Sequence, residues 1–137
     1  MTIPRLLVVE DDQDTLDLLA LWLSEKYRVF TYACATAALA ALETAKPDLL
    51  ILDIGMRPIN GVECLQAIRA VPGYDSVPAI ALTGYARDCE RQAFEAAGFQ
   101  AVLTKPILDD ELIPAITAML ASVDGQGSGE SAVRTAA

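Results

Sequence analysis

The sequence contains no histidine and only three cysteines, which form no CxxC pair. The missing histidine excludes a histidine-based catalytic triad, a histidine metal site and a phosphodonor histidine. The odd number and wide spacing of the cysteines predict neither a disulfide framework nor a zinc site. We expect them to be small reduced residues of the core or surface: Cys34, Cys64 and Cys89.

Basic charge and long apolar runs are also scarce. Ten basic residues oppose nineteen acidic ones, which gives a net charge of −9. Because nucleic-acid backbones are held by clustered Lys and Arg, we do not expect direct binding to nucleic acid. No apolar run approaches the roughly 20 residues that span a bilayer, and no signal peptide is visible at Met1. We therefore expect a soluble, cytoplasmic protein without a membrane partner.

Apolar residues, in contrast, make up 53% of the chain, which excludes a disordered or fibrous class. The length suits a single domain with one core. Residues 124–137 are polar and rich in Gly and Ser, so we expect a disordered tail after a folded domain of residues 1–123.

Short apolar segments alternate with segments of helical periodicity, at a spacing of about twenty residues. The predicted strands are 5–9, 28–33, 49–52, 78–82 and 101–103. The predicted helices are one that starts near Asp14 and includes Leu23, 35–45, one that starts at Gly61 and is ended by residues 71–73, 88–97, and one that begins near Asp109. This alternation predicts an α/β fold with a parallel sheet and right-handed crossovers. The GxGxxG spacing of a dinucleotide fold is missing after the first strand.

Pro114 conflicts with the pattern of the last helix, because it falls where that helix should be in its first or second turn. Beyond the first turn, proline removes a hydrogen bond and clashes with a carbonyl. Two outcomes are open: the helix begins later than the apolar pattern indicates, or its start is kinked.

Polar side chains follow four of the predicted strands. In a parallel sheet the carboxyl ends of the strands meet at one edge, where open α/β folds bind ligands. Carboxylates bind the hard ion Mg²⁺ and repel one another without a cation, so the edge predicts a magnesium site. The residues are Glu10, Asp11, Asp53, Thr83 and Lys105.

These side chains suit phosphoryl transfer, which needs in-line positioning and charge compensation. Asp53 is a candidate nucleophile that would form an acyl phosphate, while Thr83 and Lys105 would bind the phosphoryl oxygens. Taken singly, each residue has a plainer explanation as a helix cap (Asp11 or Asp12), a turn hydroxyl or a solvated charge. Those explanations would all have to hold at four strand ends by coincidence.

Four segments carry a family resemblance: VVEDD at 8–12, LDIGMRPING at 52–61, ALTGYA at 81–86 and LTKP at 103–106. With these motifs in this order and spacing, the chain resembles the receiver domain of two-component response regulators, from about residue 4 to 123. The resemblance implies a flavodoxin-like three-layer αβα sandwich with strand order 2-1-3-4-5.

The resemblance also implies a role for each site residue. Asp53 would be the phosphoacceptor, and Thr83 and Lys105 would bind the phosphoryl group. Mg²⁺ would be the cofactor, with Asp11 as the direct ligand and Asp53 as a further metal residue. The remaining metal positions would be Glu10, mostly through water, and the backbone carbonyl of Gly55.

The implied function is a signalling switch and not a turnover enzyme. The phosphodonor would be a sensor histidine kinase or a histidine phosphotransfer protein. No output domain follows residue 123, so we expect the output to be a protein contact with an unidentified target, or a role as phosphate sink or relay. Homodimers through the fourth helix, fifth strand and fifth helix are a further expectation.

Three departures from the family pattern bear on this interpretation. Arg57, followed by Pro58, stands where the family usually has proline. Val102 replaces the Tyr or Phe that usually swings inward three positions before the lysine, so that switch cannot operate in the usual way. The two positions that tune hydrolysis in the family are Gly55 and Tyr85.

Three alternatives stay open. The chain could be a degenerate receiver that acts as a phosphorylation-independent binding or dimerisation module. A Mg²⁺-dependent aspartyl-phosphate phosphatase is disfavoured because the DxDx(T/V) spacing is absent after the first strand. The segments LDIG and ALTGYA also resemble receivers cut from hybrid kinases.

Overall fold

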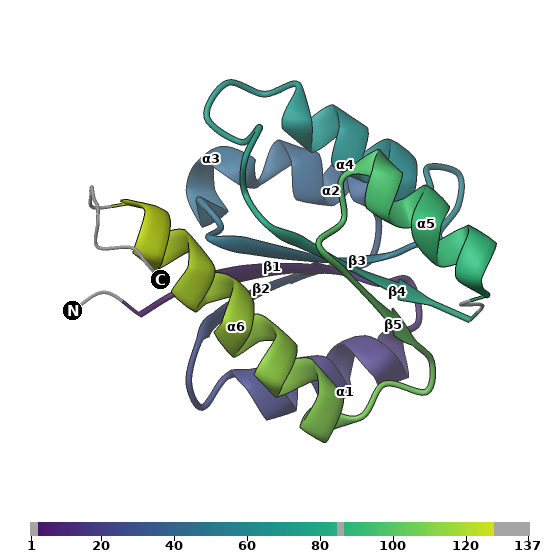
Figure 1. The fold of residues 1–137 in the computed structure, drawn as a ribbon, viewed down its shortest axis with the longest axis horizontal. Coiled ribbons are helices and arrows are strands. Elements are labelled where there is room, and N and C mark those ends of the chain that lie inside the picture. Colours follow the sequence, from purple (N-terminus) through teal and green to yellow (C-terminus); the bar gives the residue numbers. More distant parts are fainter. Residues whose placement is uncertain (1–2, 85–86, 128–137) are drawn as a thin grey trace. The chain divides into compact units, whose positions relative to one another are not determined.

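The structure is a computed structural model that describes residues 3–84 and 87–127, with side chains up to residue 121. The chain divides into two compact units, Met1–Ile107 and Leu108–Ala137, and each is described by itself. Figure 1 follows the elements along the chain from the first strand to the last helix.

The first unit is built on a five-stranded sheet of order β2-β1-β3-β4-β5, in which every neighbouring pair is parallel (Figure 1). This order and direction confirm the predicted fold. The strands are β1 Arg5–Val9, β2 Arg28–Tyr32, β3 Leu49–Asp53, β4 Ala79–Thr83 and β5 Ala101–Thr104.

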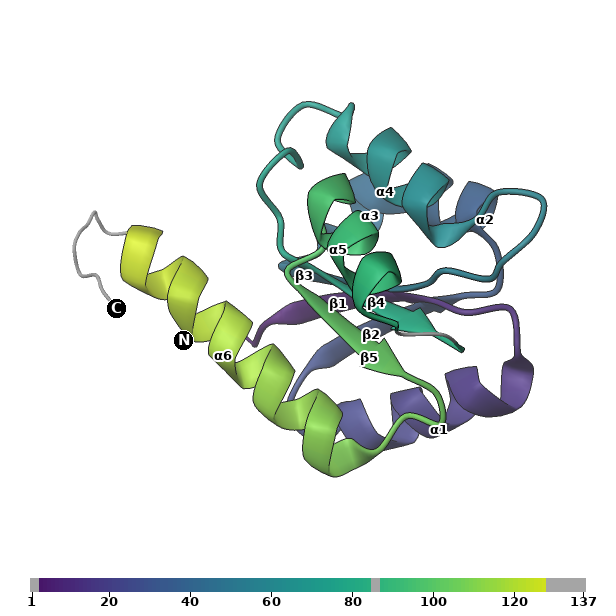
Figure 2. The same ribbon diagram turned by 45° about the vertical axis from the view of Figure 1, so that its right-hand side comes forward.

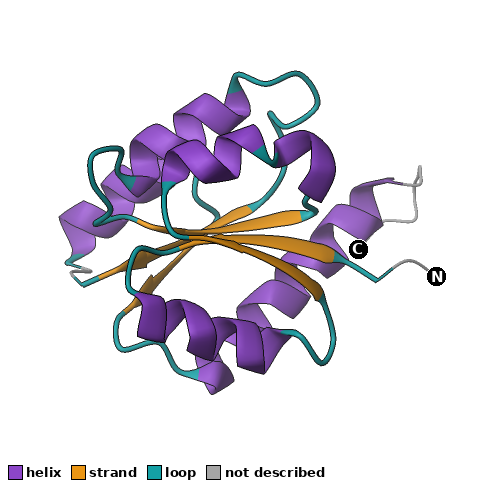
Figure 3. Cartoon of the chain, turned by 180° about the vertical axis from the view of Figure 1, so that it is seen from behind, coloured by secondary structure: helices purple, strands orange, loops and turns teal. Residues whose placement is uncertain are grey.

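Helices cover both faces of this sheet. In this unit, helix α1 lies on one face of the sheet, and α2, α3, α4 and α5 lie on the opposite face, as Figures 2 and 3 show from two further directions. The three-layer arrangement follows from the parallel strands, because each crossover places a helix on a face of the sheet. The helices are α1 Gln13–Leu23, α2 Ala35–Ala40, α3 Leu42–Ala45, α4 Gly61–Arg69 and α5 Asp88–Ala97.

The core is centred on the middle strands. Every residue of β3 and β4 is buried, which explains why both strands read as continuous apolar runs rather than alternating ones. The apolar cluster on the α2–α4 side includes Leu50 and Leu52 of β3 and Leu65 of α4, all fully buried. Asp53 ends β3 and therefore lies where the buried strand reaches the edge of the sheet.

The helix ends follow local chemistry. The side chain of Asp12 caps α1 by accepting from the Thr15 N–H at 3.0 Å, which is the cap expected as the plainer explanation for an acid here. Asn60 and Glu63 form a capping box at the start of α4. Gly98, with φ of 117°, ends α5 in the left-handed region, as predicted.

The prediction of one continuous helix over residues 35–45 is wrong. Residues 35–45 form two short helices, α2 and α3, which are separated at Ala41 (φ −98°, ψ 1°). Alanine has a high helix propensity, so the sequence contains no signal for this break. Lys46 ends α3 with a left-handed φ of 45°.

In the second unit, α6 spans Asp109–Gly127 with Pro114 inside it. The alternative that this helix begins later is therefore wrong. The helix begins with the N–H groups of Glu111 and Leu112, which both donate to the carbonyl of Leu108. Helix α6 includes residues 124–127 of the predicted tail, and residues 128–137 lie outside the described residues.

The three cysteines are free. Cys64 is buried on α4, and burial raises the pKa of its thiol to about 11, whereas Cys89 on α5 is exposed. Within the described residues, no helix has the length and apolar character needed to cross a membrane.

Candidate functional site

A pocket of about 480 Å³ lies at the carboxyl edge of the sheet. It brings together five of the six residues predicted for the site, and the sixth, Glu10, lies buried beside them. The lining residues are Asp11, Asp53, Ile54, Gly55, Thr83, Gly84, Glu90, Phe94 and Lys105.

Strand register explains why residues far apart in sequence meet here. Asp53 pairs with Leu82, and Thr83 pairs with Thr104 on the next strand. The N–H of Lys105 donates to the Thr83 carbonyl at 2.8 Å, which continues the pairing one residue beyond β5. The carboxyl ends of β3, β4 and β5 therefore meet at one edge, where Asp53, Thr83 and Lys105 line one pocket.

The carboxylate of Asp53 is nearly enclosed, with 3% of the residue exposed. Its Oδ1 accepts from the Gly55 N–H at 3.1 Å and lies 3.3 Å from the Lys105 ammonium. The N–H of Ile54 donates to the Leu82 carbonyl at 2.8 Å and holds the chain in place directly after the acid. Asp53 is thus a positioned anion with a cation beside it.

Lys105 bridges two carboxylates. Its Nζ lies 3.0 Å from Oε1 of Glu10, donates to Oε2 at 3.3 Å and lies 3.3 Å from Oδ1 of Asp53. Burial lowers the pKa of Lys105, but the hydrogen bond to Glu10 and the charges of both carboxylates outweigh it and raise the pKa overall. The lysine is therefore held as a cation next to Asp53.

Glu10 is fully buried, and its two oxygens are unequally satisfied. Oε2 accepts from the Asp12 N–H at 3.1 Å and from Lys105 at 3.3 Å, whereas Oε1 contacts the Lys105 ammonium at 3.0 Å without hydrogen-bond geometry. The pKa of Glu10 is raised from its ordinary value of 4.5 to about 7. Burial is the largest cause of this rise, and the adjacent Asp53 contributes to it. The hydrogen bonds from Asp12 and Lys105 act in the opposite direction.

The acidic residues fit a divalent cation. One carboxylate oxygen from each of Glu10, Asp11 and Asp53 lies within 4.8 Å of the others. The buried Oε1 of Glu10 has an ion pair with Lys105 but no well-formed hydrogen bond, and three crowded acids lie beside this one lysine; a hard cation would compensate both features. The donor set, all oxygen, suits Mg²⁺.

The raised pKa of Glu10 predicts an unusual pH dependence without a divalent cation. In EDTA the unfolded chain loses this proton near pH 4.5, while the folded chain retains it to about pH 7. The free energy of unfolding should therefore fall as pH rises between these values and level off above them. The loss should be on the order of 3 kcal/mol. Urea unfolding at several pH values measures it.

Glu10→Gln is the matched control for this pH dependence, since it keeps the shape of the side chain and removes the titration. The variant should lose most of the fall in stability between pH 5 and 7. An equal fall in both proteins would assign the effect to a different group.

Four pocket residues are not among those predicted for the site. Two of them, Ile54 and Gly84, directly follow Asp53 and Thr83, whereas the other two, Glu90 and Phe94, belong to α5. Glu90 and Phe94 lie four residues apart and so share a face of the helix. The sequence shows only a polar helix at this point, and no motif indicates that this face turns toward Asp53. Of the departures from the family pattern, Arg57 is exposed, Val102 is buried, and Tyr85 lies outside the described residues.

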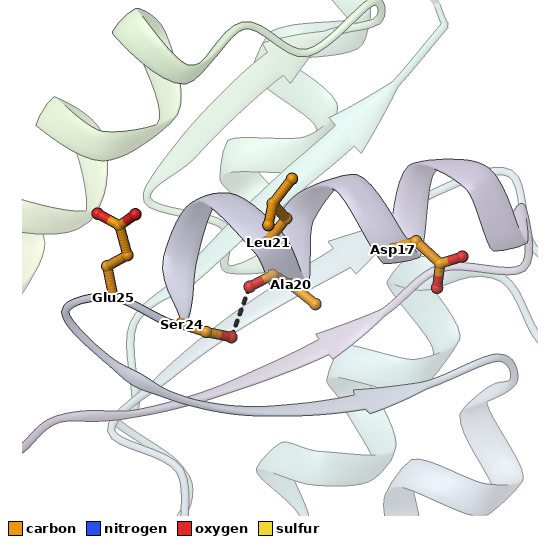
Figure 4. Close-up of a pocket in the computed structure, with 5 residues that line it drawn as sticks. All are labelled: Asp17, Ala20, Leu21, Ser24 and Glu25. Carbon is orange, nitrogen blue, oxygen red and sulfur yellow. Dashed lines mark hydrogen bonds between the residues drawn. The ribbon is translucent and has the colours of Figure 1, made fainter.

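A second hollow lies on α1 and is shown in Figure 4. Its dashed line marks the hydroxyl of Ser24 donating to the carbonyl of Ala20 at 2.5 Å. The lining residues contain acids but no basic side chain, so this surface lacks the charge compensation found around Asp53. They are Asp17, Ala20, Leu21, Ser24 and Glu25.

Comparison with known proteins agrees with this geometry. The family described as response regulator receiver domain matches residues 6–117. A 14.6 kDa protein from Leptolyngbya boryana, encoded in the sodA1 3′ region, is 44% identical over 109 residues, which cover 79% of this chain and 83% of that protein. The transcriptional regulatory protein PrrA of Mycobacterium tuberculosis is 34% identical over 121 residues, 88% of this chain and 51% of PrrA.

The chain thus spans about half the length of PrrA. Among solved structures, the chemotaxis protein CheY4 of Vibrio cholerae superposes with a TM-score of 0.82 at 26% identity, covering 86% of this chain and 99% of that one. Phosphorylation and magnesium are typical of the family that these proteins share. The chain belongs to the response regulator receiver domains of two-component systems.

Proposed function

We propose that this receiver domain accepts a phosphoryl group on Asp53 from the phosphohistidine of a sensor histidine kinase or a histidine phosphotransfer protein. One observation carries the proposal: the Asp53 carboxylate lies nearly enclosed in a pocket, 3.3 Å from the Lys105 ammonium. This is the arrangement of a nucleophile whose product, a phosphoryl dianion, is met by a fixed cation.

In the proposed reaction, an oxygen of Asp53 forms a bond to phosphorus while the phosphorus–nitrogen bond of the donor breaks. The electron pair of the broken bond leaves with the donor's imidazole. Lys105 is held by Glu10 and Asp53 and would bind one phosphoryl oxygen, and the Thr83 hydroxyl would bind another. Because these groups are already positioned, little reorganisation is needed during transfer.

Mg²⁺ is the cofactor that the acidic residues suit. Asp11 and Asp53 would hold it directly, Glu10 through water, and Gly55 through its backbone carbonyl. When bound, the ion would supply neutralising charge to the phosphoryl oxygens. The approach of one carboxylate oxygen from each of Glu10, Asp11 and Asp53 within 4.8 Å of the others supports this assignment.

A small phosphodonor tests the function without knowledge of the kinase. The protein is incubated with acetyl phosphate and Mg²⁺ and weighed intact by mass spectrometry. We expect one added phosphoryl group per chain and none when EDTA replaces Mg²⁺. The absence of an adduct across Mg²⁺ concentrations would refute the proposal and favour the phosphorylation-independent binding module.

The buried Val102 favours an output as phosphate sink or relay, because passing the group on does not need the usual aromatic side chain. The decay of the adduct after removal of acetyl phosphate addresses this role. Fast loss, or transfer to a phosphotransfer protein, supports a sink or relay. A long-lived adduct with a strong gain in affinity for a target would contradict it.

A further inference from the structure

Arg91 of α5 connects this helix to the strand that carries Lys105. One guanidinium nitrogen donates to the carbonyl of Val102 at 3.0 Å, and another donates to the hydroxyl of Thr104 at 3.3 Å. Strand β5 is an edge strand, bonded only to β4 within the sheet. Its end therefore has a sheet partner on one side and depends on side chains for further support.

The position that Arg91 supports is next to the site chemistry. Thr104 directly precedes Lys105 and pairs with Thr83 of β4. The Lys105 N–H donates to the Thr83 carbonyl at 2.8 Å. A shift of Thr104 would thus move the backbone from which the Lys105 side chain reaches Asp53.

The same helix also forms part of the pocket wall. Glu90 and Phe94, one residue before and three after Arg91, line the pocket with Asp53. A phosphoryl group on Asp53 would place new negative charge in the pocket that Glu90 lines, and like charges repel. Helix α5 therefore meets the site twice, through its pocket-lining face and through the guanidinium of Arg91.

We propose that Arg91 is a positioning residue for phosphoryl transfer, which holds Thr104, and through it Lys105, in register with Asp53 and couples the phosphoryl state of the pocket to α5. The inference rests on the proposed function and deepens it. Arg91 also links β5 to α5 without the aromatic side chain that the family usually has at position 102, where this chain has valine.

Other arginines of the chain differ from Arg91 in what they bind. Arg69 donates to the carbonyls of Tyr74, Val77 and Gly98, none of which lines the pocket. Arg87, the N-cap residue of α5, lies four positions before Arg91, is paired with Glu90 at 3.1 Å and has a side chain that is 78% exposed. Arg87→Met thus removes the same charge without touching β5, and since it also frees the pocket-lining Glu90, Glu90→Gln with Arg87 intact measures the effect of losing that ion pair.

The test compares Arg91→Met with Arg87→Met in the full chain. We expect Arg91→Met to lower the rate of Asp53 phosphorylation by acetyl phosphate about tenfold, with Mg²⁺ affinity unchanged. Thr104→Val, which loses the hydrogen bond between its hydroxyl and Arg91, should lower the rate about threefold, and Arg91→Lys should restore part of it. Arg87→Met should stay within about twofold of the unaltered protein.

A second readout separates positioning from simple support. Beryllium trifluoride, a stable mimic of the phosphoryl group, should change the amide hydrogen exchange of α5 in the unaltered protein and in Arg87→Met, but much less in Arg91→Met. A residue that only stabilises the fold would lower the melting temperature and leave this response and the rate intact.

The possible failures can be told apart. A folded Arg91→Met protein with an unchanged rate and an unchanged α5 response overturns the inference. If Arg91→Met does not fold, Thr104→Val decides, and a rate equal to that of the unaltered protein overturns the inference. If the unaltered protein accepts no phosphoryl group, the proposed function itself fails, and the role of Arg91 fails with it.

Discussion

Asp53→Asn is expected to abolish the phosphoryl adduct formed with acetyl phosphate and Mg²⁺. The amide lacks the charged oxygen that attacks phosphorus, so no acyl phosphate can form. The fold should persist, because an amide oxygen can still accept from the Gly55 N–H that now bonds Oδ1. The change also removes one of three crowded acids, so it should not lower stability in EDTA.

Intact-mass spectrometry measures this loss, and Asp17→Asn is the matched control. Asp17 lies on α1, where it accepts from the side chain of Gln13 and lines the second hollow instead of the acceptor pocket. The control should form the adduct normally. An adduct that persists in Asp53→Asn would contradict the assignment and direct attention to Asp11, the exposed carboxylate of the same cluster.

Gly61→Ala is expected to lower the free energy of unfolding by about 3 kcal/mol, the upper part of the range for overpacked sites. A Cβ at Gly61 would lie 2.6 Å from the carbonyl oxygen of Asp53 and 2.9 Å from Cα of Ile54. Both neighbours are backbone atoms, so they can yield only if α4 and the end of β3 separate. Because that movement displaces Asp53, the phosphorylation rate should fall as well.

Two other glycines separate crowding from backbone conformation in this experiment. Gly84→Ala places its Cβ in open space and should stay within about 0.5 kcal/mol. Gly73→Ala also meets no atom within 4 Å, but its φ of 95° disfavours a side chain and should cost about 1 kcal/mol. Urea unfolding of the three variants would contradict the crowding explanation if Gly61→Ala were no worse than Gly73→Ala.

Both predictions concern one junction, where β3 ends and the loop to α4 begins. The N–H of Gly61 donates to the carbonyl of Ile54 at 3.2 Å, so the start of α4 is bonded directly to the residue after the acceptor. The close backbone approach needs glycine at this position, and the approach in turn helps hold Asp53 at the pocket. Stability and chemistry are therefore coupled through the same few atoms.

Much of the fold was predictable because its signals are local. The buried strands read as apolar runs, and the start of α4 at Gly61 and the end of α5 at Gly98 follow from residue type alone. The meeting of the acidic residues with Thr83 and Lys105 was also predictable, because parallel strands must bring their carboxyl ends to one edge. Their individual roles remain predictions.

The sequence by itself determined which elements form, where most of them begin and end, and which edge of the sheet carries the polar side chains. Only the tertiary structure decided the break at Ala41, the burial of Glu10 against Lys105 and the reach of Arg91 to β5. It also placed Glu90 and Phe94 on the pocket wall. These features depend on burial and on distances between elements far apart in the chain, whereas hydrophobic periodicity and caps depend on near neighbours.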